Sequence, residues 1–227
     1  MTLTNIILSE KKWNEELVLS LATQNKDSNW KLINNKSDFR IDVLEKLNVN
    51  KIFIPHWSYF IPKDIYEKYE CIIFHMTDLP FGRGGSPLQN LILRGFTETK
   101  ISAIKVEEGL DTGPIYLKTK LSLEGTAEEI FIRSSHIIYK MILTILENQI
   151  IPISQIGNPV VFKRRKKEES NIIELKELNQ LFDHIRMLDC DGYPKAFIEN
   201  DDIKFEFSKA ELKSKNELIA NVRIFKK

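Results

Sequence analysis

The residues best suited to chemistry in this chain are His75 and Asp111, which flank a glycine-rich segment. An imidazole titrates near neutral pH, and a carboxylate beside it fixes its orientation, so such a pair can move a proton and stabilise charge on a reacting oxygen. Glycine serves where the backbone takes positive φ or approaches a ligand closely. The glycines concentrated here are Gly82, Gly84, Gly85, Gly95, Gly109 and Gly113. This cluster indicates a site, although a core histidine and a turn aspartate explain the pair alone equally well.

Strands and helices in alternation are expected to position His75. Short apolar runs at 5–8, 30–33, 51–55 and 71–74 are typical of buried strands, and helical patterns separate them. This alternation predicts an α/β fold with a mostly parallel sheet, in which ligands gather at the carboxyl ends of the strands. His75 stands at one such end. Strands predicted at 100–106 and 114–121 flank Asp111, so the loop between them is expected to be tight and to bring Asp111 toward His75.

A long helix and a change in composition divide the chain. Thr126 and Glu129 have the spacing of a capping box, and apolar residues follow at helical spacing as far as Ile145. Two prolines, a glycine and the basic run 163–167 come next. We therefore predict a main domain over 1–157 and a small C-terminal subdomain over 158–227, with a helix from 178 to 188 and a strand around 203–207.

Composition and charge narrow the classes of function. With 33 basic and 32 acidic side chains the net charge is +1, which argues against a nucleic-acid or membrane partner. The basic run 163–167 lacks interleaved aromatic residues and precedes Glu168 and Glu169, so we interpret it as a solvated linker. Cys71 and Cys190 do not have the pattern of a disulfide framework or a metal site. We therefore expect no metal. No secretion signal or membrane span is recognisable, so we expect a cytoplasmic location.

The complete motif resembles the 10-formyltetrahydrofolate-dependent formyltransferase family over nearly the whole chain. That family has a histidine, a proline five residues later, an Arg-Gly, a further proline and, well downstream, an Asp-x-Gly. The corresponding residues here are His75, Pro80, Arg83-Gly84, Pro87 and Asp111-Thr112-Gly113. The C-terminal part is similar to the same family at Arg164-Arg165, Ile185-Arg186 and the segment 193–197.

The resemblance implies a Rossmann-like formyltransferase core, a small C-terminal α+β subdomain and 10-formyltetrahydrofolate as co-substrate. The segment Phe-His-Met-Thr-Asp at 74–78 is most similar to the corresponding segment of small bacterial sugar N-formyltransferases of the pseudaminic-acid pathway type and of the formylation domain of linear gramicidin synthetase. We therefore expect a sugar N-formyltransferase whose partner is a nucleotide-linked amino sugar, such as a UDP-4-amino-4,6-dideoxy sugar. The alternatives are methionyl-tRNA formyltransferase, which the short C-terminal part and low net charge disfavour, and a non-catalytic folate-binding domain.

A homodimer is possible through the apolar C-terminal face, which could equally dock on the main domain.

The resemblance also assigns roles to residues. His75 would stabilise the oxyanion formed when a primary amine attacks the formyl carbon, and Asp111 would orient His75 and assist proton removal. The folate would contact Trp57, Phe60, Ile61, Gly109, Leu110 and Asp111. The amine substrate would contact Lys12, Trp13, Thr77, Arg83, Gly84 and Gly85. For single aromatic residues core packing is an equal alternative, and for Arg83 we rank bracing of the glycine loop above phosphate binding.

One position departs from the family pattern. The family usually has asparagine two residues before the histidine, whereas this chain has Ile73. Loss of one preorganised oxyanion donor typically costs roughly a hundredfold or more in rate. Either another group supplies this hydrogen bond, for which Thr77, Gln89 and Asn90 are candidates, or turnover is slow.

Overall fold

The computed structural model describes residues 2–227 and divides into two compact units. The first contains Met1–Arg83, Lys100–Leu121 and Ile132–Val161, and the second contains Gly84–Thr99, Ser122–Phe131 and Phe162–Lys227. The units interleave along the sequence, whereas the predicted division at residue 157 is a single cut. That division stays a prediction.

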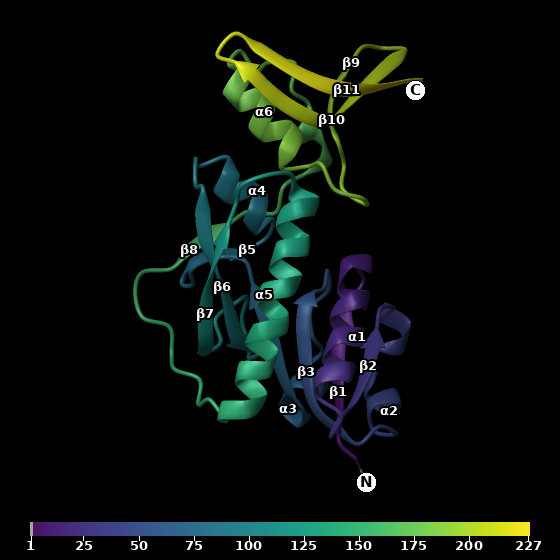
Figure 1. Ribbon diagram of the computed structural model, residues 1–227, viewed down its shortest axis with the longest axis vertical. Helices are drawn as coiled ribbons and strands as arrows, with labels where there is room; N and C mark the ends of the chain where they lie inside the picture. Colours follow the sequence, from purple (N-terminus) through teal and green to yellow (C-terminus); the bar gives the residue numbers. More distant parts are fainter. Residues whose placement is uncertain (1) are drawn as a thin grey trace. The chain divides into compact units, whose positions relative to one another are not determined.

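A six-stranded sheet forms the centre of the first unit, with the order β2-β1-β3-β4-β6-β7 (Figure 1). Its strands are β1 (Thr4–Ser9), β2 (Asn29–Ile33), β3 (Val49–His56), β4 (Glu70–His75), β6 (Glu98–Lys105) and β7 (Ile115–Ser122). β1 pairs in parallel with β2 and β3, β3 pairs in parallel with β4, and β4 pairs antiparallel with β6. The predicted α/β fold with a mostly parallel sheet is confirmed.

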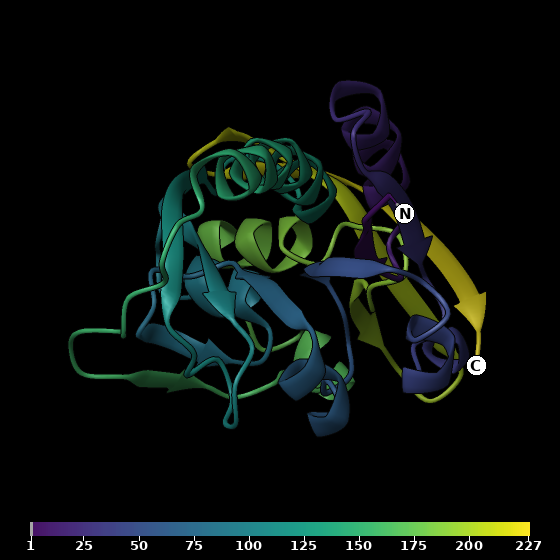
Figure 2. The ribbon, with the colours of Figure 1, turned by 90° about the horizontal axis from the view of Figure 1, so that it is seen from below.

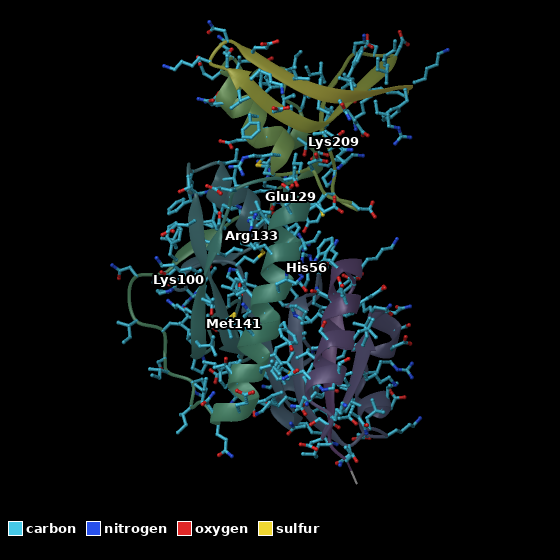
Figure 3. The ribbon with its side chains drawn as sticks, in the orientation of Figure 1. His56, Lys100, Glu129, Arg133, Met141 and Lys209 are labelled. Atoms are coloured by element: carbon cyan, nitrogen blue, oxygen red, sulfur yellow. The ribbon has the colours of Figure 1, made fainter. Side chains whose placement is uncertain are left out.

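Helices cover both faces of this sheet, as expected for parallel strands joined by helical crossovers. In Figure 2, α1 and α5 lie on one face and α2 and α3 on the other. These helices are α1 (Glu15–Gln24), α2 (Ile41–Leu44), α3 (Lys63–Lys68) and α5 (Ala127–Asn148). Because both faces are covered, all six residues of β1 are buried, and Met141 of α5, labelled in Figure 3, is only 2% exposed.

The parallel register sets the level at which the strands end. Ser9, the last residue of β1, lies opposite His56, the last residue of β3. Ile54 of β3 pairs with Ile73 of β4, so two residues further His56 and His75 reach the same level. The carboxyl ends of three neighbouring strands therefore carry Ser9, His56 and His75, and His75 occupies the predicted strand end.

The second unit contains a three-stranded antiparallel sheet with the order β11-β10-β9 and two helices. Its elements are α4 (Pro87–Ile92), α6 (Leu178–Arg186), β9 (Ala196–Glu199), β10 (Ile203–Ser214) and β11 (Glu217–Lys226). The predicted helix and small sheet after residue 158 are thus present. The first turn of α5 also belongs here, and it begins at the predicted capping box: the Thr126 amide donates to Glu129 Oε2 at 2.8 Å, and the Glu129 amide donates to Thr126 Oγ1 at 3.3 Å.

The remaining elements are short. β5 (Phe81–Gly84) and β8 (Val160–Phe162) form a two-stranded sheet. The 3-10 turns are η1 (Lys12–Asn14), η2 (Lys36–Asp38) and η3 (Lys167–Ser170). Within residues 2–227, no helix is both long and apolar enough to cross a membrane.

Candidate active site

His75 and Asp111 meet in the first unit. His75 Nδ1 lies 3.5 Å from Asp111 Oδ2, and the two side chains are only 8% and 9% exposed. This separation is longer than a typical direct hydrogen bond, and contacts between catalytic groups often shorten only when a reacting group is bound. The predicted convergence of two residues that are far apart in the sequence is therefore present in the structure.

The other ring nitrogen of His75 faces a backbone carbonyl. Nε2 lies 2.7 Å from the oxygen of Gly82, which can only accept, so Nε2 carries a proton and donates it. Thr77 Oγ1 donates to the same oxygen at 3.3 Å. Because Gly82 fixes the Nε2–H, Nδ1 is the nitrogen that can exchange a proton beside Asp111.

The backbone around Asp111 is unusual. Asp111 has φ 53°, in the left-handed region that few non-glycine residues adopt. Gly113 is needed because a Cβ there would lie 1.8 Å from the carbonyl oxygen of Lys105. Thr112 Oγ1 donates to the carbonyl of Glu108 at 2.9 Å and closes the loop on itself. The tight loop predicted between the two strands is thus held in one conformation.

Gln155 contacts this loop, and sequence reasoning did not find it. Its Nε2 donates to the carbonyl oxygens of Asp111 and Gly113 at 2.8 Å each, and its Oε1 accepts from Arg83. Arg83 thus braces the Asp111 loop through Gln155. The only signal in the sequence was a single amide side chain within the isoleucine-rich segment 150–156.

The predicted folate residues after β3 have different environments. Trp57 packs edge-on against Phe39 and Tyr59, with ring centroids 5.9 and 5.4 Å apart, and both Trp57 and Ile61 pack against a cluster of buried apolar side chains. Phe60 is 86% exposed. The core-packing alternative therefore explains Trp57 and Ile61, whereas Phe60 remains a surface side chain suited to a ligand.

The predicted substrate loop after β1 is anchored by buried polar groups. Asn14 Nδ2 donates to Ser9 Oγ at 2.8 Å, and Ser135 Oγ of α5 donates to Asn14 Oδ1 at 2.9 Å. Trp13 packs edge-on against His56, labelled in Figure 3, with centroids 5.9 Å apart. Lys12 is exposed at the start of η1. The loop thus presents Lys12 and Trp13 from a fixed backbone at the carboxyl end of β1.

Gly84 and Gly85, two predicted substrate residues, lie in the second unit and pack closely against the chain itself. A Cβ on Gly84 would lie 2.4 Å from the Phe162 carbonyl oxygen, and one on Gly85 would lie 2.6 Å from Arg164 Cβ. Close packing by the chain itself therefore explains both glycines, and the expected contact with the amine substrate is not needed to account for them.

None of the three expected oxyanion donors points its donor group toward an open space. Gln89 Nε2 donates to the carbonyl of Met187 at 3.1 Å, and Asn90 Nδ2 donates to three backbone carbonyls. Thr77 Oγ1 donates to Gly82, as described above. Each of these groups already donates to a backbone carbonyl in the structure, and their role as the missing oxyanion donor stays a prediction.

Asp78, three residues after His75, forms ion pairs with Lys100 and Lys118. Burial tends to raise the pKa of Asp78, but hydrogen bonds from Lys118 and Lys100 outweigh it and hold the pKa below its ordinary value. Cys71 and Cys190 are buried and not joined in a disulfide, and burial raises the pKa of Cys71 to about 12. Among residues 2–227, no group of three or more His, Cys, Asp or Glu side chains is placed to hold a metal ion.

Comparison with family models decides the class of this site. Residues 9–143, more than half of the chain, match the model described as "Formyl transferase". The chain belongs to the formyl transferase family. Residues 167–225 match a second model, described as "Methionyl-tRNA formyltransferase, C-terminal domain". The family predicted from the motif around His75 and Asp111, and the enzyme class that goes with it, are confirmed.

Individual relatives refine the placement within the family. The methionyl-tRNA formyltransferase of Rickettsia typhi is 29% identical over 182 residues, 78% of this chain and 60% of that protein. The same enzyme of Campylobacter lari is 30% identical over 168 residues, 73% of this chain and 55% of that protein. The chain thus spans less than two thirds of these curated relatives.

Solved structures of the family include two informative matches. The methionyl-tRNA formyltransferase from Clostridium thermocellum superposes with a TM-score of 0.95 at 46% identity, and 100% of each chain is covered. The formyltransferase PseJ from Anoxybacillus kamchatkensis superposes with a TM-score of 0.58 at 22% identity, over 84% of this chain and 94% of that one. At that identity the second match shows the shared fold alone.

These findings overturn two predictions. The predicted sugar N-formyltransferase of pseudaminic-acid type, with a nucleotide-linked amino sugar as partner, is wrong, because the curated relatives named above, the full-length structural match at 46% identity and the C-terminal model are methionyl-tRNA formyltransferases. The predicted lack of a nucleic-acid partner is contradicted by the same matches. The net charge of +1 was a poor guide to nucleic-acid binding, because it is a sum over the whole chain and does not describe the charge of any local surface.

Within the formyl transferase family the departure at Ile73 remains. Ile73 and His75 are two residues apart on β4, so their side chains point to the same face of the sheet. Ile73 is partly buried and packs against the core cluster. An apolar side chain therefore occupies the position where the motif usually has an amide.

Proposed function

We propose that the protein transfers the formyl group of 10-formyltetrahydrofolate to the amino group of methionyl-tRNA. The observation that carries this proposal is the match at 46% identity over the whole of both chains to a methionyl-tRNA formyltransferase. The match of residues 167–225 to the C-terminal domain model of the same enzyme supports it independently. Methionyl-tRNA formyltransferase was the first alternative predicted from the sequence.

His75 and Asp111 supply the groups that such a reaction needs. The amine nitrogen forms a bond to the formyl carbon, and the carbonyl electron pair moves to oxygen. His75 stabilises that oxyanion by its charge or by a proton at Nδ1, because Nε2–H is already held by Gly82. Asp111, 3.5 Å from Nδ1, orients the ring and takes up the proton that the amine loses. When the carbonyl re-forms, the bond between the formyl carbon and N10 of the folate breaks, and this proton passes to N10 as tetrahydrofolate leaves.

The folate co-substrate supplies the formyl group when bound. Gly109, Leu110 and Asp111 form the loop that we assign to its ring, because Gly109 and Asp111 have positive φ and Leu110 is 49% exposed. Phe60 adds an exposed apolar ring. We assign the bound amine to the loop bearing Lys12 and Trp13.

The test is a formylation assay with purified protein, 10-formyltetrahydrofolate and methionyl-tRNA, with the product identified by its mass after release of the amino acid. We expect formylmethionine and a stoichiometric amount of tetrahydrofolate. The variants His75→Ala and Asp111→Asn should lose about 10²–10⁴-fold in rate with unchanged unfolding midpoints, because each removes a group acting on the reacting atoms. Absence of formylmethionine from the wild-type protein under saturating donor would refute the proposal.

A further inference from the structure

The carboxamide of Gln155 is fully used in joining two segments of the first unit. Its Oε1 accepts from Arg83 Nε at 3.1 Å and from Arg83 Nη2 at 2.7 Å. Its Nε2 donates to the carbonyl oxygens of Asp111 and Gly113, each at 2.8 Å. An amide accepts at one end and donates twice at the other, whereas a carboxylate only accepts and an ammonium only donates. The contact therefore requires an amide with this reach.

These hydrogen bonds act where the backbone needs support. Asp111 has φ 53°, and a non-glycine residue persists in such a conformation only where its surroundings hold it. Gln155 bonds the carbonyl of Asp111 itself and that of Gly113, on the far side of Thr112. The backbone conformation sets the direction of the Asp111 carboxylate, which faces His75.

Gln155 is partly buried and lies in a segment with mostly exposed side chains. Its neighbours Ile153 and Ile156 are 70% and 86% exposed, so side-chain burial contributes little to the position of this segment. The backbone hydrogen bonds between Ile153 and Ile115 of β7 anchor one end. Gln155 is then fixed by its contact with Arg83.

Two consecutive residues of β5 contact the His75–Asp111 pair, one directly and the other through Gln155. The carbonyl of Gly82 accepts from His75 and sets the orientation of the ring. The side chain of Arg83, the next residue, binds Gln155 and through it the Asp111 loop. A shift of this strand would move both members of the pair.

We infer that Gln155 and Arg83 are positioning residues that hold the Asp111 carboxylate against His75. The inference rests on the proposed function, since it assigns these residues a part in formyl transfer through Asp111. Neither side chain needs to contact a substrate in this role.

The decisive variant is Gln155→Glu, which keeps the size of the side chain and its contact with Arg83. It replaces the donor Nε2 by an oxygen that faces two carbonyl oxygens, so the loop must move away. We expect kcat to fall about 10–100-fold, because small misplacement of a catalytic group costs about that much. Arg83→Leu should have a similar effect that does not add to that of Gln155→Glu. Gln24→Glu, at an exposed position on α1, is the matched control and should leave kcat unchanged.

Two further measurements separate positioning from general destabilisation. In an Asp111→Asn background, under single-turnover conditions, Gln155→Glu should cause less than a twofold further loss, because its effect passes through Asp111. Amide hydrogen exchange in residues 106–114 should become faster in Gln155→Glu, while exchange in β4 and the unfolding midpoint stay as in the wild type. A full additional loss in the Asp111→Asn background would overturn the inference, as would unchanged exchange in the loop.

Failure of the inference is distinguishable from failure of the proposed function. If Asp111→Asn abolishes formylmethionine production while Gln155→Glu has the wild-type kcat, the function stands and the positioning role is wrong. If the wild-type protein does not formylate methionyl-tRNA, the function is wrong, and hydrogen exchange in residues 106–114 still decides whether Gln155 holds the loop.

Discussion

At the scale of single residues, each ring nitrogen of His75 has a distinct neighbour. Gly82 holds Nε2 through a carbonyl, and Asp111 faces Nδ1. The two environments differ because one neighbour is a neutral acceptor and the other a carboxylate that can also bind a proton. This asymmetry assigns proton exchange to the Nδ1 side.

The aromatic residues after β3 give a prediction that separates packing from ligand contact. Phe60→Ala should raise the KM for 10-formyltetrahydrofolate about tenfold and leave the unfolding midpoint unchanged, because the ring is 86% exposed. Trp57→Ala should instead lower the free energy of unfolding by about 2–3 kcal/mol, because that ring packs on Phe39 and Tyr59. Kinetics and chemical denaturation measure the two effects.

The control for Phe60 is Leu19→Ala, which removes another exposed apolar side chain, on α1. It should change neither the KM nor stability. A Phe60→Ala variant with the wild-type KM would show that this ring does not contact the donor.

At the scale of elements, one polar network joins three strands of the six-stranded sheet. Glu70 of β4 binds Lys51 of β3 and accepts from Tyr116 of β7 at 2.8 Å. Burial by itself raises the pKa of Glu70, but the hydrogen bonds from Lys51 and Tyr116 outweigh it, so the pKa lies below its ordinary value. The network therefore favours the folded state while Glu70 is ionised.

This lowered pKa predicts how stability depends on pH. A depressed folded-state pKa gives stability that is present above the unfolded-state value and is lost as the pH falls through the folded-state value. Glu70→Gln should thus lower the free energy of unfolding by about 1 kcal/mol at pH 7, and the difference from wild type should shrink below about pH 4. Urea unfolding across this range measures it.

The matched control for Glu70 is Glu67→Gln, whose surface pair with Lys63 leaves both side chains more than half exposed. Its effect should stay under about 0.5 kcal/mol at every pH. An undiminished effect of Glu70→Gln at low pH would contradict the ionised network.

The start of α5 gives a second prediction at this scale. Thr126→Ala removes the acceptor for the Glu129 amide, so the free energy of unfolding should fall by about 1 kcal/mol with activity unchanged. Thr144→Ala, at an exposed position near the C-terminal end of the same helix, should raise the free energy of unfolding by a few tenths of a kcal/mol, because alanine has the higher helix propensity. Equal effects of the two variants on thermal unfolding would show that the cap does not stabilise the helix.

At the scale of the whole molecule, the near-zero net charge conceals an uneven distribution. The hairpin of β10 and β11 carries more basic than acidic side chains. The basic ones are Lys204, Lys209, Lys213, Lys215, Arg223, Lys226 and Lys227, and the acidic ones are Glu206, Glu211 and Glu217. Lys209 is labelled on this hairpin in Figure 3. A local excess of positive charge is what contact with tRNA phosphates requires.

This distribution predicts a salt-dependent interaction under the proposed function. Lys215→Ala and Lys226→Ala should each weaken binding of methionyl-tRNA and reduce the slope of log K against log salt by up to about 1, because each removes a phosphate contact. Lys26→Ala, an exposed lysine of the first unit, should leave the slope unchanged. Filter binding between low and moderate salt measures this. An unaltered slope in both hairpin variants would place the tRNA contact elsewhere.

The sequence by itself determined the local features of this protein. Apolar runs fixed the strands, the capping pattern fixed the start of α5, and the spacing from His75 to Asp111 identified the family. These features depend on periodicity and on residue types that lie close together, so they can be recognised without the fold.

Only the tertiary structure decided how the site is held. The carbonyl of Gly82 has no sequence signature, and Gln155 reaches the Asp111 loop from 44 residues away. Thr77, Gln89 and Asn90 were reasonable donors by type, but their hydrogen bonds go to backbone carbonyls that only the fold brings near. A side chain's partner depends on long-range packing, and residue type fixes only what that partner can be.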